Sequence, residues 1–330
     1  MPPQSHPASA ADIANEDKQA HENHDKHVDQ PLNYVNIFFI TLGHVLFVYY
    51  CVTFPWIQKF YLVLYTAANM HFTGLGVTAG AHRYFTHRSY KAKLPLKVLL
   101  LIAYASCGHN KLYDWVRDHR THHKFVETDA DPHNSNRGFF FSHVGWLFMK
   151  KHPEVVAKGK TMNMSDISGD PLLVWYDRHY ILMKTIFCFT IPTLIPYYLL
   201  NEDLYTCMYT QCIMRYIILL NITWSVNSFA HMYGNKPYNK HENSKENLAV
   251  SIATIGEGWH NYHHAFPWDY RASEHGKVNF TTNWLDLCGR LGLAYDFRAA
   301  TESMIRKVVL KTGDGSHKNF ACFAEDEKDI

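Results

Sequence analysis

The chain has 330 residues, of which 47% are hydrophobic and 15% aromatic, with a formal net charge of +2. This length allows one large domain or two ordinary ones. The nearly neutral charge argues against a nucleic-acid-binding protein, which would be strongly basic. The seven cysteines form no C-x-x-C pair, so we expect free thiols rather than a disulfide framework.

Residues 1–30 are polar, with few large apolar side chains. Such a segment cannot bury enough apolar surface to order itself, so we expect a disordered cytosolic tail. It also lacks a basic stretch followed by an apolar core, so we expect no signal peptide. Residues 31–312 form the expected folded domain, and 313–330 a flexible C-terminal tail.

Four apolar blocks follow, each near the length of about 20 residues that spans a bilayer. They predict membrane spans at residues 34–52, 57–81, 180–200 and 206–230. Only short turns separate the first from the second and the third from the fourth, so the spans pair into two helical hairpins. We therefore predict an all-α integral membrane protein with four transmembrane helices.

The block Leu94–Cys107 contains Lys97 and is too short for a comfortable span. If it crossed the membrane, it would also separate histidine motifs that a shared metal site needs on one side. All but three of the 32 Lys and Arg residues lie outside the predicted spans and their turns. By the positive-inside rule, residues 82–179 and 231–312 then form a helical cytosolic cap, with both termini cytosolic.

Residues 138–148 are rich in aromatic side chains and are followed closely by Lys150 and Lys151. This pattern predicts an interfacial helix, with aromatic rings toward lipid and basic groups toward headgroups. An ordinary buried helix explains the pattern equally well.

Histidines dominate the candidate chemistry. The motif H-x-x-H-H occurs twice, and a looser pair precedes both copies. On a helix, the spacing i, i+3, i+4 places three imidazoles on one face, where two or three of them can converge on one metal ion. The fourth predicted span also ends with Asn227 and His231 at i, i+4. The candidate histidines are His82, His87, His119, His122, His123, His231, His260, His263 and His264.

Nine histidines and one amide suit two metal ions of five- or six-coordination, and iron is the natural candidate. Structural zinc usually takes cysteine, which is absent near the motifs, and the H-E-x-x-H of zinc proteases is missing. Two irons can activate O2 to remove hydrogen from an unactivated methylene. The chain has neither a G-x-G-x-x-G fingerprint nor the haem motif H-P-G-G, so we expect it to bind no nucleotide or haem and to take electrons from another protein. The other histidines, His133 among them, are interpreted as ordinary surface or core residues.

The stretches 82–88, 119–123 and 256–264 resemble the three histidine boxes of membrane acyl-CoA desaturases. The resemblance covers residues 31–312, is of the stearoyl-CoA type, and is closest to the insect branch that includes moth pheromone-gland enzymes. It implies an endoplasmic reticulum membrane enzyme with two iron ions, reduced (Fe2+) at rest. It also implies a long-chain fatty acyl-CoA substrate, a membrane lipid environment, and electrons from cytochrome b5 and its NADH-dependent reductase.

The resemblance also implies roles for individual residues. The nine histidines hold iron, Asn227 holds it through water, and no further catalytic group is expected. The positions matching substrate contacts are Asn36, Asn110, Arg117, Asp118, Lys150, Lys151 and Trp224. The chain departs from the family pattern at His109, Trp259, Tyr84 and Phe85. These four are the candidates for setting the position of the double bond.

The sequence thus predicts O2-dependent insertion of a double bond into a fatty acyl-CoA, of the delta-9 or delta-11 type, in fatty acid or pheromone-precursor synthesis. A fatty acyl hydroxylase or acetylenase on the same scaffold is the alternative enzyme. A metal-binding membrane protein is the alternative from another class.

Overall fold

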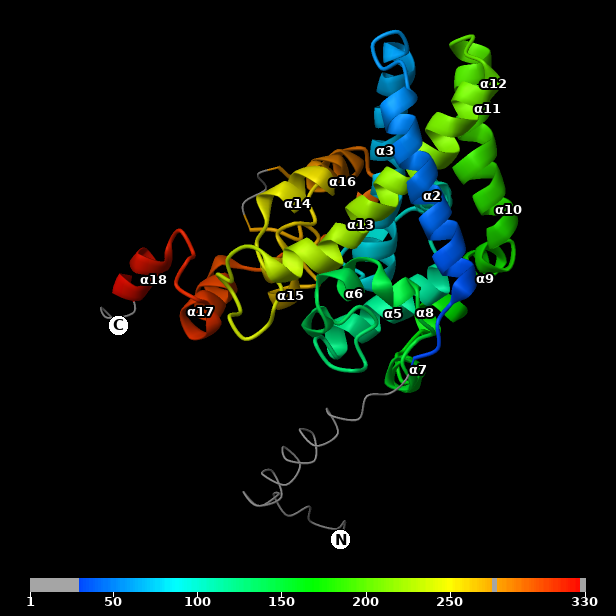
Figure 1. Ribbon diagram of the computed structural model, residues 1–330. Helices are drawn as coiled ribbons and strands as arrows, with labels where there is room; N and C mark the ends of the chain where they lie inside the picture. The colour runs from blue at the N-terminus through cyan, green and yellow to red at the C-terminus, as the bar shows by residue number, and fades with distance from the viewer. Residues whose placement is uncertain (1–29, 275–277, 327–330) are drawn as a thin grey trace.

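The computed structural model describes residues 30–274 and 278–326, and this part of the chain is mostly helical, with loops and one small sheet. Nearly all of the expected N-terminal tail therefore lies outside the described residues. Two helical hairpins stand together on one side of a broad assembly of shorter helices (Figure 1). The histidine motifs lie in or beside those shorter helices, below the hairpins.

The first hairpin consists of α2 (Tyr34–Thr53) and α3 (Phe60–Leu75). The second ascends through α10 (Tyr180–Lys184), η4 (Thr185–Thr190) and α11 (Ile191–Leu199), then descends through α12 (Leu204–Met208), η5 (Tyr209–Met214) and α13 (Arg215–Met232). An ion pair of 2.5 Å between Lys59 and Glu202 joins the tips of the two hairpins.

Two helices in the described part of the chain are long and apolar enough to cross a membrane, Tyr34–Thr53 and Tyr180–Leu199. Along α2 only Tyr50 is buried, and Val52 is 81% exposed, as expected of a helix whose apolar side chains face lipid. Neither of the spans predicted at 57–81 and 206–230 forms a single helix that is long and apolar enough to cross a membrane. The four-span arrangement therefore stays a prediction.

The helix α3 continues without a break into η1 (Gly76–Thr86), a π-helical segment that is almost wholly buried. At its start, Gly76 lies against the backbone of α4 (Leu94–Cys107), where a Cβ would come within 2.2 Å of the Ala103 carbonyl carbon. Only glycine permits this approach. The close packing of α4 on η1 sets the position of the first histidine pair.

The remaining helices and one small sheet build the cap. The chain segment that connects the two hairpins forms, after α4, the elements α5 (Leu112–Lys124), η2 (Ser135–Arg137), α6 (Phe139–His143), η3 (Gly145–Leu147), α7 (Pro153–Gly159), α8 (Ser165–Ser168) and α9 (Pro171–Arg178). After the second hairpin come α14 (Leu248–Ala253), α15 (His260–Ala265), α16 (Phe280–Arg290), α17 (Glu302–Thr312) and α18 (Phe320–Asp326). The strand β1 (Lys91–Ala92) pairs antiparallel with β2 (Ala294–Tyr295) and joins the two parts of the cap.

The prediction of one interfacial helix over residues 138–148 is wrong. The segment divides into the five-residue α6 and the short 3-10 turn η3, because the chain turns at Val144, where φ is −136°. Phe140 is 61% exposed, whereas Phe141 is buried. The aromatic run therefore has an inner and an outer side but forms no continuous amphipathic surface.

Part of the segment expected to form a flexible tail, residues 313–326, packs against the cap. Phe323 is buried in a cluster with Ile305 and Val309 of α17. His317 is buried as well, and its Nε2 lies 2.7 Å from a carboxylate oxygen of Glu274. The segment is polar on average, but a few of its apolar side chains, such as Phe323, pack against the cap.

Candidate metal centre

The structure gathers the nine predicted histidines into two neighbouring clusters. In each cluster, one ring nitrogen from every histidine lies within 4.8 Å of the others. The five-histidine cluster contains His82, His87, His119, His123 and His263. The four-histidine cluster contains His122, His231, His260 and His264.

The π-helical form of η1 explains how the looser pair meets. In an α-helix, residues five apart point in different directions, whereas a π-helix closes i to i+5 hydrogen bonds and places them on one side. The His87 N–H donates to the His82 carbonyl oxygen at 3.1 Å, and the two ring centres lie 4.9 Å apart. The spacing that looked irregular in the sequence is therefore regular for this segment.

Each of the two H-x-x-H-H motifs is divided between the two clusters, with two of its histidines in one cluster and one in the other. In α5, His119 and His123 point into the five-histidine cluster, while His122 points into the other. In α15, the i, i+4 pair of His260 and His264 lies in the four-histidine cluster. The remaining member, His263, joins the five-histidine cluster.

The ring nitrogens face one another in a way that hydrogen bonding alone does not explain. The Nε2 atoms of His263 and His123 lie 3.0 Å apart, and those of His231 and His260 also lie 3.0 Å apart. The buried Nε2 of His87 has no hydrogen-bond partner in the described part of the chain. Because a neutral imidazole carries one N–H and one lone pair, converging nitrogens of this kind fit metal ions better than each other.

The pKa values of most of these rings favour metal binding. Burial, and then repulsion by neighbouring histidines, lowers the pKa of seven of them: His87, His119, His123, His231, His260, His263 and His264. These rings are neutral at pH 7, and the neutral imidazole is the form that ligates a metal.

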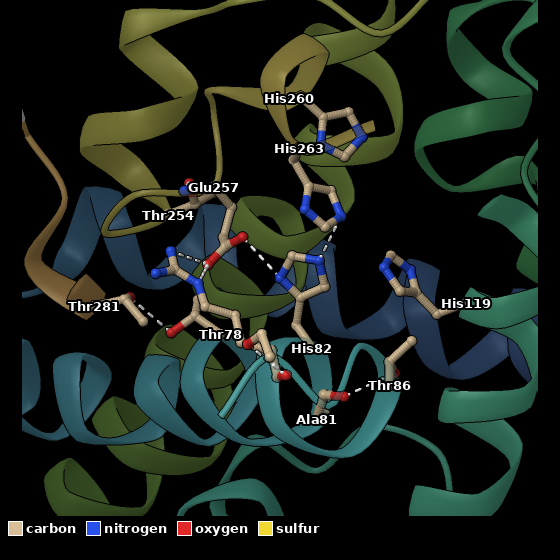
Figure 2. Close-up of polar contacts among 12 residues, drawn as sticks. Thr78, Ala81, His82, Thr86, His119, Thr254, Glu257, His260, His263 and Thr281 are labelled. Carbon is tan, nitrogen blue, oxygen red and sulfur yellow. Dashed lines mark hydrogen bonds and ion pairs between the residues drawn. The ribbon is translucent and has the colours of Figure 1, made fainter. Parts of the chain in front are cut away.

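Carboxylates surround the clusters. Glu257 lies 2.8 Å from His82 Nδ1 and also accepts from the Arg83 guanidinium at 2.7 Å (Figure 2). Burial would raise the pKa of Glu257, but Arg83 and His82 outweigh it and hold the pKa at about 2. Asp131 accepts from His122 Nδ1 at 2.9 Å, and this contact keeps the pKa of the buried Asp131 carboxyl well below its usual value.

An apolar cavity of 330 Å³ reaches the five-histidine cluster at His82 and His119, and the four-histidine cluster at His260. Side chains of α2 and α13, such as Phe39, Ile40, Ile217 and Leu220, form much of its wall. Four of the predicted substrate residues line it: Asn36, Asn110, Asp118 and Trp224. Asn227 also lines it, one helical turn before His231.

The three predicted basic contacts lie beside the cavity rather than in its wall. Arg117 donates to Asp118 at 3.1 Å and pairs with Asp114 at 3.0 Å. Lys151 also pairs with Asp118. Lys150 is exposed, and its backbone N–H donates to the Pro31 carbonyl oxygen.

Only one of the four candidates for bond position, His109, lines the cavity. Burial and the nearby Lys184 lower its pKa to about 4, so the ring is neutral at pH 7. The other three do not line this cavity. Phe85 is 3% exposed within a core cluster, Tyr84 packs against it with ring centres 4.7 Å apart, and Trp259 is absent from the cavity wall.

Sequence reasoning missed four polar residues around the clusters. They are the carboxylates Asp131, Glu242 and Glu257, together with His133, which lines the cavity with its ring centre 4.3 Å from that of His122. The sequence carried a partial signal, since Glu257 lies three residues before His260 in the third box and Asp131 follows the second motif within ten residues. Glu242 gave no such signal.

Comparison with known proteins decides the family. The fatty acid desaturase family model matches residues 56–278. The acyl-CoA Delta-9 desaturase of Acheta domesticus is 50% identical over 261 residues, covering 78% of this chain and 71% of its own. The stearoyl-CoA desaturase 5 of Bos taurus is 48% identical over 288 residues, covering 87% of this chain and 86% of its own. The chain belongs to the fatty acid desaturase family.

As a member of this family, the chain is an oxidoreductase, an acyl-CoA desaturase, and its histidine clusters fit metal binding. The relatives do not agree on the bond they form. A second protein of Acheta domesticus, the acyl-CoA Delta12-desaturase, is 52% identical over 261 residues, covering 78% of this chain and 73% of its own. Overall identity to these relatives therefore does not indicate the bond position.

Proposed function

We propose that this desaturase uses two iron ions, one in each histidine cluster, to insert a double bond into a long-chain fatty acyl-CoA with O2. The observation that carries the proposal is the meeting of both clusters with one apolar cavity. His82 and His119 of one cluster and His260 of the other lie in its wall. A methylene chain in the cavity would lie beside both ions.

Iron, when bound, supplies the O2 chemistry that removes hydrogen from an unactivated methylene. The protein's part is to hold and orient the chain. The apolar wall, including Phe39, Ile40 and Leu220, suits an acyl chain and keeps bulk water from the site. Asn227 lines the cavity near His231 and suits a contact to iron through a water molecule.

The part of the cavity wall at Asp118 would bind the coenzyme A portion of the substrate. Asp118 lies in the cavity wall and is held by Arg117 and Lys151, so it joins the cavity to a basic surface. Basic side chains at such a position suit phosphate groups. Asn36 and Asn110, also in the wall, can hydrogen-bond the polar atoms near the thioester.

We further infer that four spans anchor the cap to the endoplasmic reticulum membrane, with both termini cytosolic, and that cytochrome b5 and its NADH-dependent reductase supply electrons. Two observations support four spans: the paired hairpins rise from the same side of the cap (Figure 1), and α3 and the α12–η5 segment are uncharged partners of the two long apolar helices. A role in fatty acid or pheromone-precursor synthesis, with a delta-9 or delta-11 bond, follows from the resemblance to the insect branch.

Expression in a desaturase-deficient yeast tests the proposal. We expect a new double bond in the acyl lipids, and purified protein with two irons per chain. The absence of any new unsaturated product across saturated and monounsaturated chains of several lengths contradicts it. A hydroxylated or acetylenic product instead identifies the alternative activity on the same scaffold.

A further inference from the structure

One histidine from each of the three motifs has its Nδ1 atom next to a carboxylate. The distances are 2.8 Å from His82 to Glu257, 2.9 Å from His122 to Asp131, and 3.2 Å from His264 to Glu242. The three carboxylates come from three different loops. Glu257 contacts a histidine of the five-histidine cluster, and the other two carboxylates contact histidines of the four-histidine cluster.

An Nδ1–H directed at a carboxylate fixes the imidazole in one tautomer and one orientation. The lone pair is then on Nε2, the atom that must face a metal. Partners of this kind typically contribute 10- to 100-fold to metal affinity. The ring nitrogens that approach the other histidines are Nε2 atoms, for example His82 Nε2 at 2.9 Å from His263 Nε2 and His264 Nε2 at 3.1 Å from His260 Nε2.

Glu257 is itself held firmly. Its Oε1 accepts from Arg83 Nε at 3.0 Å and from Arg83 Nη2 at 2.7 Å, which leaves Oε2 to face His82 (Figure 2). Arg83 is 1% exposed and also donates to Thr282 Oγ1 and to the Tyr270 carbonyl oxygen. The preceding Gly256, at φ +130°, makes the turn that brings Glu257 to this point.

The partners of the four-histidine cluster are held by other means. Asp131 Oδ1 also accepts from the His133 backbone N–H at 3.1 Å, and Oδ2 accepts from the Glu127 backbone N–H at 3.0 Å. Glu242 Oε1 accepts from Asn239 Nδ2 at 2.9 Å, which leaves Oε2 at 3.2 Å from His264 Nδ1. This buried oxygen has no hydrogen-bond partner among the described residues, so its contact with His264 is an ion-pair approach that lacks hydrogen-bond geometry.

We propose that Glu257, Asp131 and Glu242 are positioning residues that each fix one motif histidine for metal binding, Glu257 for one metal ion and the other two for the second ion. This inference rests on the proposed di-iron function. Each carboxylate should therefore affect the binding of one ion only. A residue that merely stabilised the fold would affect both ions.

The amide isosteres test the role sharply. In Glu257→Gln, Arg83 requires an oxygen at the Oε1 position, so the amide N–H groups face His82 Nδ1. That nitrogen can accept only if the ring proton moves to Nε2, which then cannot bind metal. In Glu242→Gln, Asn239 enforces the same orientation toward His264. Both substitutions preserve side-chain shape, and the first keeps the acceptor for Arg83.

The measurement is iron binding by purified full-length protein in detergent, with 57Fe Mössbauer spectra of the loaded protein. We expect each isostere to weaken binding of one of the two irons about 10- to 100-fold. Glu257→Gln should alter the Mössbauer signal of one iron, while Glu242→Gln and Asp131→Asn should both alter that of the other. Asp170→Asn, which changes a carboxylate at the N-terminus of α9 paired with Lys97, is the matched control and should change neither.

A rescue separates positioning from folding. Adding Asn239→Ala to Glu242→Gln frees the amide to turn its oxygen toward His264, so the double variant should recover part of the iron affinity. The proposal is overturned if the wild type holds two irons and the isosteres bind both as tightly, or if all three variants affect both irons alike. A wild type that yields unsaturated product yet holds no iron would instead overturn the di-iron function itself.

Discussion

The Nε2 atoms of His82 and His263 lie 2.9 Å apart, although 181 residues separate them in the chain. His82 comes from the end of the first hairpin, and His263 from the short helix α15 after the second. Two buried imidazoles at this distance gain little from each other, and a shared metal ion explains their approach. The contact thus ties the two hairpins to one site.

His263→Ala tests this relationship. The substitution removes a ligand from the five-histidine cluster, so we expect the iron content to fall from about two to about one per chain and product formation to be lost. The control is His179→Ala, which removes a cap imidazole whose described side-chain contacts are all with Trp175. Unchanged iron content in His263→Ala would contradict the assignment.

His109→Gln tests the cavity. His109 is the one candidate for bond position found in the cavity wall, and its buried Nε2 has no hydrogen-bond partner among the described residues. We expect the substitution to change the bond position or preferred chain length while iron content stays the same. Gas chromatography–mass spectrometry of the products measures the change. Trp259→Phe, outside the cavity wall, is the comparison and should leave the product distribution unaltered.

The histidines predict how the metal-free protein responds to pH. Burial lowers the pKa of His119 and His263 below the unfolded value of about 6.5, so the unfolded chain binds more protons below that pH. Their contribution to stability is complete above about pH 6.5 and is lost as pH falls toward the folded pKa. Each such ring adds about 1.4 kcal/mol per pH unit to this loss.

We therefore expect the Tm of chelator-treated protein to fall steeply between about pH 6.5 and 5. His119→Asn should make the fall shallower, because an amide does not titrate. A Tm that is flat over this range would show that the rings are protonated in the folded protein.

Phe323→Ala tests the packing of the C-terminal segment. The ring is 6% exposed and lies among the side chains of α17, so its removal should destabilise the protein by about 3 kcal/mol, near the lower end for a buried phenylalanine. Thermal unfolding in detergent measures the loss. The neighbouring Cys322 is exposed, and Cys322→Ala should have almost no effect.

The sequence by itself determined the chemistry of the site. The H-x-x-H-H spacing identified six of the nine clustered histidines, because periodicity along a helix is local and readable. The looser pair and the end of the fourth predicted span supplied His82, His87 and His231. The apolar blocks located the two helices long enough to span a membrane for the same reason. Of the paired carboxylates, Glu257 and Asp131 lie near the motifs in the sequence, whereas Glu242 meets His264 only through a loop of the folded cap.

Tertiary structure alone decided how the histidines are shared. A π-helical segment, which packs on α4 and which the residue spacing did not reveal, brought His82 and His87 together. The 100° turn per residue of α5 and α15 divided each H-x-x-H-H between two clusters, and the partners on facing elements determined which member went to which. The cavity wall likewise excluded Tyr84, Phe85 and Trp259, because the direction of a side chain depends on its neighbours in space.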